Sequence, residues 1–166
     1  MSAYQLAQLN IGVIRGPIGS AVMAEFVAAL DGVNALAESS PGFVWRLQTE
    51  EGNATAIRPY PENDNIAVNL SVWTDVDSLR RFVFQTAHAD FMRRRREWFE
   101  KMVEAYLVLW WVPKGHLPGI EEAKARLERL RREGPGPEAF TFRQAYPAPD
   151  APQSTPASFS DECPAT

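Results

Sequence analysis

The segment IAVNLSVW, residues 66–73, is predicted to form a β-strand whose two faces differ in chemistry. Successive side chains of a strand point to opposite sides of its sheet, so residues two apart share a face. One face is apolar and the other carries an amide, a hydroxyl and an indole: Val68, Leu70 and Val72 on the first, Asn69, Ser71 and Trp73 on the second. We therefore expect this strand to be buried on one side and to line a polar, aromatic space on the other.

The rest of the chain makes this strand the third of four. Hydrophobic alternation and turn residues predict the other strands, and apolar stripes at helical spacing predict three helices. The strands are expected at 4–15, 43–48, 66–73 and 106–112, and the helices at 20–39, about 74–105, and 120–133. The order βαββαβ is the ferredoxin-like split βαβ pattern, so the predicted fold class is α+β with a C-terminal helical extension.

One domain is expected, because a chain of 166 residues suffices for a single hydrophobic core. The domain is predicted to span residues 1–146, with a small added strand at 140–142. Proline, alanine and serine dominate residues 147–166, which we predict to be a disordered tail.

The predicted helices cover only one face of the sheet, which leaves the apolar face of residues 66–73 without a partner. The fourth predicted strand is apolar on both faces as well. An identical sheet from a second copy is the simplest cover for such a surface. We therefore predict a two-fold homodimer, a dimeric α+β barrel, in which the two sheets pack against each other.

The composition argues against several classes of function. The formal net charge of −4 disfavours nucleic-acid binding, and no apolar run approaches the roughly 20 residues that span a bilayer. The first residues lack the pattern of a signal peptide, so a cytoplasmic location is expected. One cysteine, Cys163, and two histidines, His88 and His116, are too few for a cysteine or histidine metal cluster, so no metal site is predicted.

The second helical region is predicted to break near residues 85–88, because its apolar stripe changes side there. The stripe of residues 79–86 would leave His88 on the outer side of a straight helix. Counted from His88, a second stripe recurs at helical spacing: Phe91, Met92, Arg95, Phe99 and Met102. A kink would turn His88 and Arg95 toward the sheet, whereas the other arginines of residues 93–96 are expected on the outer surface.

Polar groups on the helix-facing side of the sheet are the candidates for chemistry. Asn10 of the first strand can share that side with Asn69 and Ser71, where a carboxamide can hold a substrate oxygen and stabilise an enolate. Asn34 interrupts the apolar stripe of the first helix, where an unsatisfied amide costs roughly 1–3 kcal/mol. Each amide has an alternative, structural role, in which it hydrogen-bonds neighbouring backbone or another amide.

His88 and Arg95 also have alternative roles. A histidine with a reference pKa of roughly 6.5 suits proton abstraction near neutrality, but it can equally cap a helix or form a structural hydrogen bond. An inward arginine needs a carboxylate, phosphate or carbonyl partner. For Arg95 we expect a structural salt bridge, with an anionic substrate or a contact across the dimer as alternatives.

Four stretches together resemble an uncharacterised bacterial family that is a domain of unknown function: AQLN at 7–10, NLSVW at 69–73, RRRREWF at 93–99 and LWWVPKGH at 109–116. The similarity runs from about residue 4 to residue 142. That family looks like a branch of the dimeric α+β barrel superfamily, which antibiotic-biosynthesis and haem-degrading monooxygenases also resemble. The resemblance implies this fold and a pocket between sheet and helices, without implying a known activity.

The resemblance also extends to possible site residues. Cofactor-free anthrone-oxidising monooxygenases line their site with a first-strand Asn and an Asn-x-x-x-Trp third strand, which Asn10, Asn69 and Trp73 resemble. Our first hypothesis is therefore a cofactor-independent oxygenase, isomerase or cyclase for a hydrophobic, oxygen-bearing small molecule, with His88, Asn69 and Trp73 as catalytic residues. The substrate-binding residues would be Asn10, Asn34, Ser71 and Arg95.

Two alternatives stand beside this hypothesis. The first is a haem-binding or haem-degrading protein with His88 as the iron ligand, because haem-degrading relatives of this fold ligate iron from the second helix. The second is a non-catalytic ligand-binding or structural dimer, in which the polar groups satisfy one another.

Overall fold

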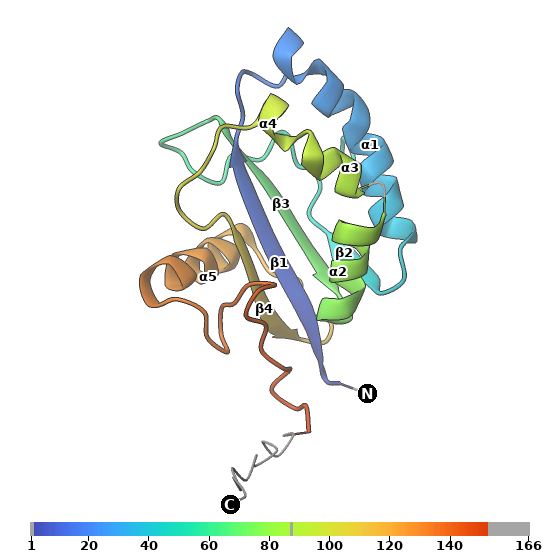
Figure 1. Cartoon of the computed structure of the whole chain (residues 1–166), viewed down its shortest axis with the longest axis vertical. Helices are drawn as coiled ribbons and strands as arrows, with labels where there is room; N and C mark the ends of the chain where they lie inside the picture. The colour runs from blue at the N-terminus through green and yellow to red at the C-terminus, as the bar shows by residue number, and fades with distance from the viewer. Residues whose placement is uncertain (1, 87, 153–166) are drawn as a thin grey trace, which may run out of the picture.

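The computed structural model describes residues 2–86 and 88–152, which fold around a four-stranded antiparallel sheet (Figure 1). The strands are β1 (Tyr4–Val13), β2 (Phe43–Arg46), β3 (Ile66–Trp73) and β4 (Leu107–Pro113), in the spatial order β2-β3-β1-β4. The helices are η1 (Ala21–Met23), α1 (Ala24–Ser39), α2 (Val76–Gln85), α3 (His88–Arg93), α4 (Arg95–Trp98) and α5 (Ile120–Glu133). This arrangement confirms the predicted α+β, ferredoxin-like fold with a helical extension.

The central strands β1 and β3 pair so that their polar residues lie opposite one another. Gln8 is opposite Ser71, and Asn10 is opposite Asn69. Residues directly opposite each other in an antiparallel pair share a face of the sheet. These side chains lie on the face that α1 and α2 cover, so the predicted division of β3 into a polar and an apolar face is confirmed.

The apolar face of the sheet is buried within the single chain. Leu9, Leu70 and Val72 on this face are at most 1% exposed. Helix α5, which lies beside β4 in Figure 1, packs on this face with three side chains: Ala123, Leu127 and Leu130. This is the face that we expected a second copy to cover. Because α5 occupies it, the homodimer, which stays a prediction, would have to use another surface.

The helical region after β3 breaks where the stripes predict a break. His88 is the first residue of α3, which is a separate helix from α2. The helical part ends at Trp98, however, so the predicted extension to about residue 105 is wrong. Phe99 forms a bridge with Ile14 at the end of β1, and a backbone held in this way cannot continue the helix. None of the helices in the described part of the chain is long and apolar enough to cross a membrane.

The chain that follows α5 returns to the edge of the sheet. Phe140 exchanges two backbone hydrogen bonds of 2.8 Å with Leu109 of β4, so the strand predicted at 140–142 is a single bridge. Asp150, beyond the predicted domain end, accepts hydrogen bonds from the N-terminal segment. Residues 153–166, which make up most of the predicted tail, lie outside the described residues.

Candidate functional site

A cavity of about 140 Å³ lies between the polar face of the sheet and the helices above it. Its floor comes from β1 and β3, and its roof includes Phe26 of α1, Phe82 of α2 and Phe91 of α3. The residues that the sequence singles out as site candidates all line this cavity: Asn10, Asn34, Asn69, Ser71, Trp73, His88 and Arg95. The fold therefore brings groups from two strands and three helices into one space.

A chain of hydrogen bonds orders the polar side chains on the floor. The amide nitrogen of Gln8 donates to Asn69 Oδ1 and, at 2.9 Å, to Ser71 Oγ. The Ser71 hydroxyl oxygen also accepts from Trp73 Nε1 at 2.9 Å. These bonds use acceptor atoms of Asn69 and Ser71, so the Ser71 hydroxyl hydrogen and the Asn69 amide N–H groups stay available. The floor therefore offers hydrogen-bond donors to a ligand.

The floor is deep at one end and open at the other. Trp73 is 1% exposed and Ser71 is 6% exposed, whereas Asn69 of the same strand is solvent-exposed. Strand β2 pairs with β3 only as far as Arg46 opposite Ser71, so no strand flanks Asn69 on that side. The cavity floor therefore extends from the exposed Asn69 to the buried Trp73.

Two more amides enter the cavity without a protein partner. The side chains of Asn10 and Asn34 form no hydrogen bond within residues 2–86 and 88–152, although Asn34 is only 8% exposed. Among the described residues, the only completely buried side-chain nitrogen or oxygen atom without a hydrogen-bond partner is the Tyr60 hydroxyl. The Asn34 amide is therefore not completely buried. An unsatisfied buried amide costs roughly 1–3 kcal/mol. Asn34 is therefore placed to bond a molecule that enters the cavity.

His88 is enclosed by aromatic side chains at the start of α3. The centroid of its ring lies 4.7 Å from that of Phe82 and 6.2 Å from that of Phe91. His88 Nδ1 lies 3.3 Å from the Val83 carbonyl oxygen, which can only accept, so Nδ1 carries the proton. Burial lowers the pKa of His88, and the bond to Val83 opposes that shift. The neutral ring therefore keeps a lone pair on Nε2, which can act as a base.

Arg95 is a half-buried cation that lines the cavity. Its guanidinium donates to the Ile11 carbonyl at 3.0 Å and lies 4.6 Å from the ring centroids of both Phe99 and Tyr106. Burial lowers the pKa of this guanidinium. The expected structural salt bridge is wrong, since no carboxylate of the described residues lies within 4.0 Å of it. A carbonyl and two rings hold Arg95 instead, which leaves N–H donors for a ligand oxygen.

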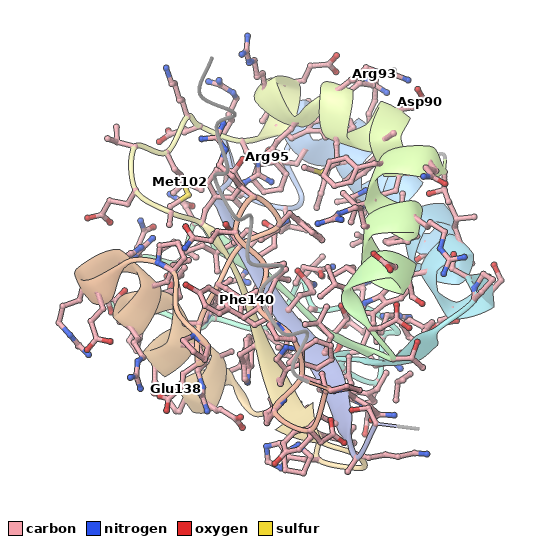
Figure 2. All side chains as sticks on the ribbon, turned by 60° about the horizontal axis from the view of Figure 1, so that its bottom comes forward. Asp90, Arg93, Arg95, Met102, Glu138 and Phe140 are labelled. Carbon is pink, nitrogen blue, oxygen red and sulfur yellow. The ribbon has the colours of Figure 1, made fainter. Side chains whose placement is uncertain are left out.

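The neighbouring arginines lie on the outer surface, as their helical positions predict. Arg93 pairs with Asp90, and both lie at the periphery in Figure 2, whereas Arg95 lies closer to the sheet. Arg94 pairs with glutamates, and Arg96 is exposed. The stretch of four arginines therefore contributes one side chain to the cavity and three to the surface.

Gly12 provides the space that Arg95 and Phe99 occupy over the end of β1. A Cβ atom at Gly12 would overlap the Phe99 ring and lie 3.1 Å from Arg95 Nη2. Any larger residue would push both side chains away from the strand. The glycine therefore allows the cation to approach the floor of the cavity.

The size of the cavity fits a single ring and does not fit a haem. Its volume of about 140 Å³ is below the roughly 300–1,000 Å³ of pockets for drug-sized ligands. It is close to the roughly 150 Å³ of a cavity that holds one benzene molecule. A porphyrin is therefore much larger than this cavity.

Gln8 is a site residue that we did not select from the sequence. It is 5% exposed, and its amide nitrogen connects Asn69 with Ser71. Alternation along the first strand places Gln8 on the same face as Asn10, so the signal for its location was present. Its role depends on the strand register, which the sequence does not state.

Several solved structures resemble this chain; they are shorter than it and differ strongly from it in sequence. SnoaB, a cofactor-independent oxygenase from Streptomyces nogalater, is 24% identical over 70% of this chain and 100% of that chain, with a TM-score of 0.48. NE2512, a protein of unknown function from Nitrosomonas europaea, is 16% identical over 70% and 97%, with a TM-score of 0.42. A protein from the same organism, named provisionally as an antibiotic biosynthesis monooxygenase, is 11% identical over 72% and 97%, with a TM-score of 0.45. These values assign no activity to this chain.

No curated protein matches the chain. One family does match, over residues 5–156, and this range includes every residue that lines the cavity. The chain belongs to the family described as domain of unknown function DUF3291.

Proposed function

We propose that this protein binds a small ring-containing molecule with a carbonyl or hydroxyl oxygen and removes a proton from it with His88. The observation that carries the proposal is the meeting of a neutral imidazole and a set of unpaired donors in one cavity. Proton abstraction next to a carbonyl needs both, because a base takes the proton while donors stabilise the charge that develops on oxygen.

The donors on the floor favour an oxygen that becomes negative. The Ser71 hydroxyl accepts two hydrogen bonds, so the hydrogen that it retains is a donor. Asn69 accepts from Gln8 through Oδ1 and keeps its N–H groups. Arg95 adds a charged donor, so an enolate or phenolate would be held more tightly than the neutral molecule.

His88 is suited to the role of the base. Because burial lowers its pKa, the ring stays neutral at pH values where an exposed histidine is partly protonated. In the proposed step, the C–H proton passes to Nε2 while the bonding electrons move to the substrate oxygen, giving an enolate and an imidazolium. Return of the proton to another carbon would complete an isomerisation, whereas reaction of the enolate with dioxygen would make the protein an oxygenase.

Trp73 has a positioning role in this proposal. Its indole donates to Ser71 Oγ, and its ring is stacked on Phe82 with centroids 5.1 Å apart. Phe82 in turn contacts the ring of His88. Trp73 thereby supports both the floor donor and the base, while its remaining surface lines the inner end of the cavity.

Deuterium exchange of phenylacetone tests the proposal, because this one-ring ketone has acidic hydrogens next to its carbonyl. We expect the protein in D₂O to accelerate loss of these hydrogens, measured by proton NMR, and His88→Gln to lower that acceleration roughly 100-fold. His116→Gln, which changes the other histidine of the chain, should keep the wild-type rate. Equal rates for wild type and His88→Gln would overturn the proposal, and binding without exchange would favour a non-catalytic ligand-binding protein.

A further inference from the structure

After α5, residues 140–150 run along β4; we call this segment the strap. Phe140 begins the strap with its two backbone bonds to Leu109. Further along, the Tyr146 carbonyl accepts from Trp111 Nε1 at 2.9 Å. At its end, Asp150 Oδ1 accepts from the Ser2 hydroxyl at 2.7 Å, and Oδ2 accepts from the Ala3 backbone N–H at 2.6 Å. The strap is therefore attached at three points to the strand at the edge of the sheet and to the chain start.

The strap lies on the cavity side of the sheet, opposite α5. Phe140 is fully buried in a cluster with Trp73, Leu79 and Phe82, whereas the α5 side chains belong to the cluster on the other face. The chain therefore passes around the edge strand β4 and covers it from both sides (Figure 1). The helices α1 to α3 lie over the other strands, so the strap supplies the cover that β4 lacks on this side.

Phe142 connects the strap with α2. Its carbonyl oxygen accepts from Arg80 Nη2 at 3.1 Å, and its ring centroid lies 5.5 Å from that of Phe84 in an edge-to-face contact. The Arg80 guanidinium lies 5.9 Å from the same ring. Phe142 also lines the cavity, together with Leu107 of β4 and Val83 of α2. Its side chain therefore forms the wall between β4 and α2.

We propose that Phe142 limits the size of the ligand, so that the cavity selects molecules of one ring over molecules with two fused rings. The inference deepens the proposed function, since it concerns the same cavity. The volume of about 140 Å³ leaves space for one ring beside this wall. The Phe142 ring now fills a space between β4 and α2. Removing the ring would add that space to the cavity. A second fused ring of a ligand would then occupy the space.

Phenol and 2-naphthol are suitable probes, because they share one hydroxyl and differ by a single fused ring. Their affinities are measured by NMR titration of the whole chain. We expect wild type to prefer phenol at least tenfold, and Phe142→Ala to shift the ratio of the two affinities at least tenfold toward 2-naphthol. Phe142→Leu should give a smaller shift in the same direction, and Phe142→Trp should weaken phenol binding.

Phe84→Ala is the matched control, because Phe84 contacts the Phe142 ring but is 58% exposed and does not line the cavity. It should leave the ratio at the wild-type value. Equal ratios in wild type and in folded Phe142→Ala or Phe142→Leu would overturn the inference, as would failure of both probes to bind. The two proposals can also fail separately. If Phe142→Ala changes the affinity ratio while His88→Gln exchanges deuterium at the wild-type rate, Phe142 limits ligand size but the proposed proton abstraction by His88 is wrong.

Discussion

The two faces of the sheet are built from the same strands, yet one is filled and the other is hollow. Leu9 and Leu70, which lie opposite each other in the ladder, are both 1% exposed beneath α5. The next pair along the same strands, Asn10 and Asn69, borders the cavity. A shift of one residue along the chain therefore separates a packed core from a site that can bind a molecule.

This difference indicates what each face contributes. Apolar side chains in close contact stabilise the fold, and burial of each large one contributes about 1.5–3 kcal/mol. Polar side chains around a cavity cost stability unless they are hydrogen-bonded, so their presence is typical of a functional site. Three predictions test this difference between the two faces.

The largest effect is expected on the filled face. Leu127 of α5 is fully buried against the sheet, so Leu127→Ala should lower the free energy of unfolding by about 2–5 kcal/mol in urea titrations. Leu117→Ala, at a residue that is 51% exposed, should stay within about 0.5 kcal/mol of wild type. Equal effects of the two substitutions would show that α5 is not part of the core.

A pH-dependent effect is expected from His88 on the hollow face. Because burial lowers its pKa in the folded protein, the unfolded chain binds a proton at a higher pH than the folded chain does. The free energy of unfolding should therefore fall as the pH drops below about 6.5, by up to about 1.4 kcal/mol per pH unit. His88→Gln should reduce this dependence in denaturation curves between pH 7 and pH 5. Parallel profiles of the two proteins would contradict the buried, neutral state of His88.

The smallest effect has the opposite sign. Asn34→Leu replaces an amide that has no side-chain partner in the described structure, so it should raise the free energy of unfolding by about 1 kcal/mol. It should also weaken phenol binding, because the cavity loses a polar group. If Asn34→Leu instead destabilises the protein, Asn34 forms a structural hydrogen bond and its role is to stabilise the fold rather than to bind a ligand.

Local patterns in the sequence predict much of this fold. The ranges 66–73 and 120–133 agree with β3 and α5 because alternation and helical stripes are strong there. The break before His88 was predictable, since a stripe cannot change sides on a straight helix. The early end at Trp98 was not, because it depends on the bridge between Phe99 and Ile14, which are distant in the sequence.

The packing of α5 on the apolar face and some contacts of the site could not be predicted from the sequence for the same reason. The stripe of α5 shows that one side of the helix is buried but does not state which face of the sheet it meets. The carbonyl and aromatic partners of Arg95 come from β1 and from the chain after α4. Phe142 reaches the cavity only because the strap passes around β4. Apart from the contact of Arg95 with Phe99, which is four residues away, these contacts join segments that periodicity does not relate.

Two buried indoles report on the two faces and give the most direct test of the central claim. Trp73 is 1% exposed at the cavity, whereas Trp110 is fully buried on the apolar face, where it donates to Glu122 at 3.2 Å. Their indole N–H resonances can be assigned with Trp→Phe variants and followed while phenylacetone is added. A ligand bound over the polar floor should shift the Trp73 resonance and leave that of Trp110 in place. A shift of Trp110 alone, or an unmoved Trp73 at saturating phenylacetone, would contradict a binding site on this face of the sheet.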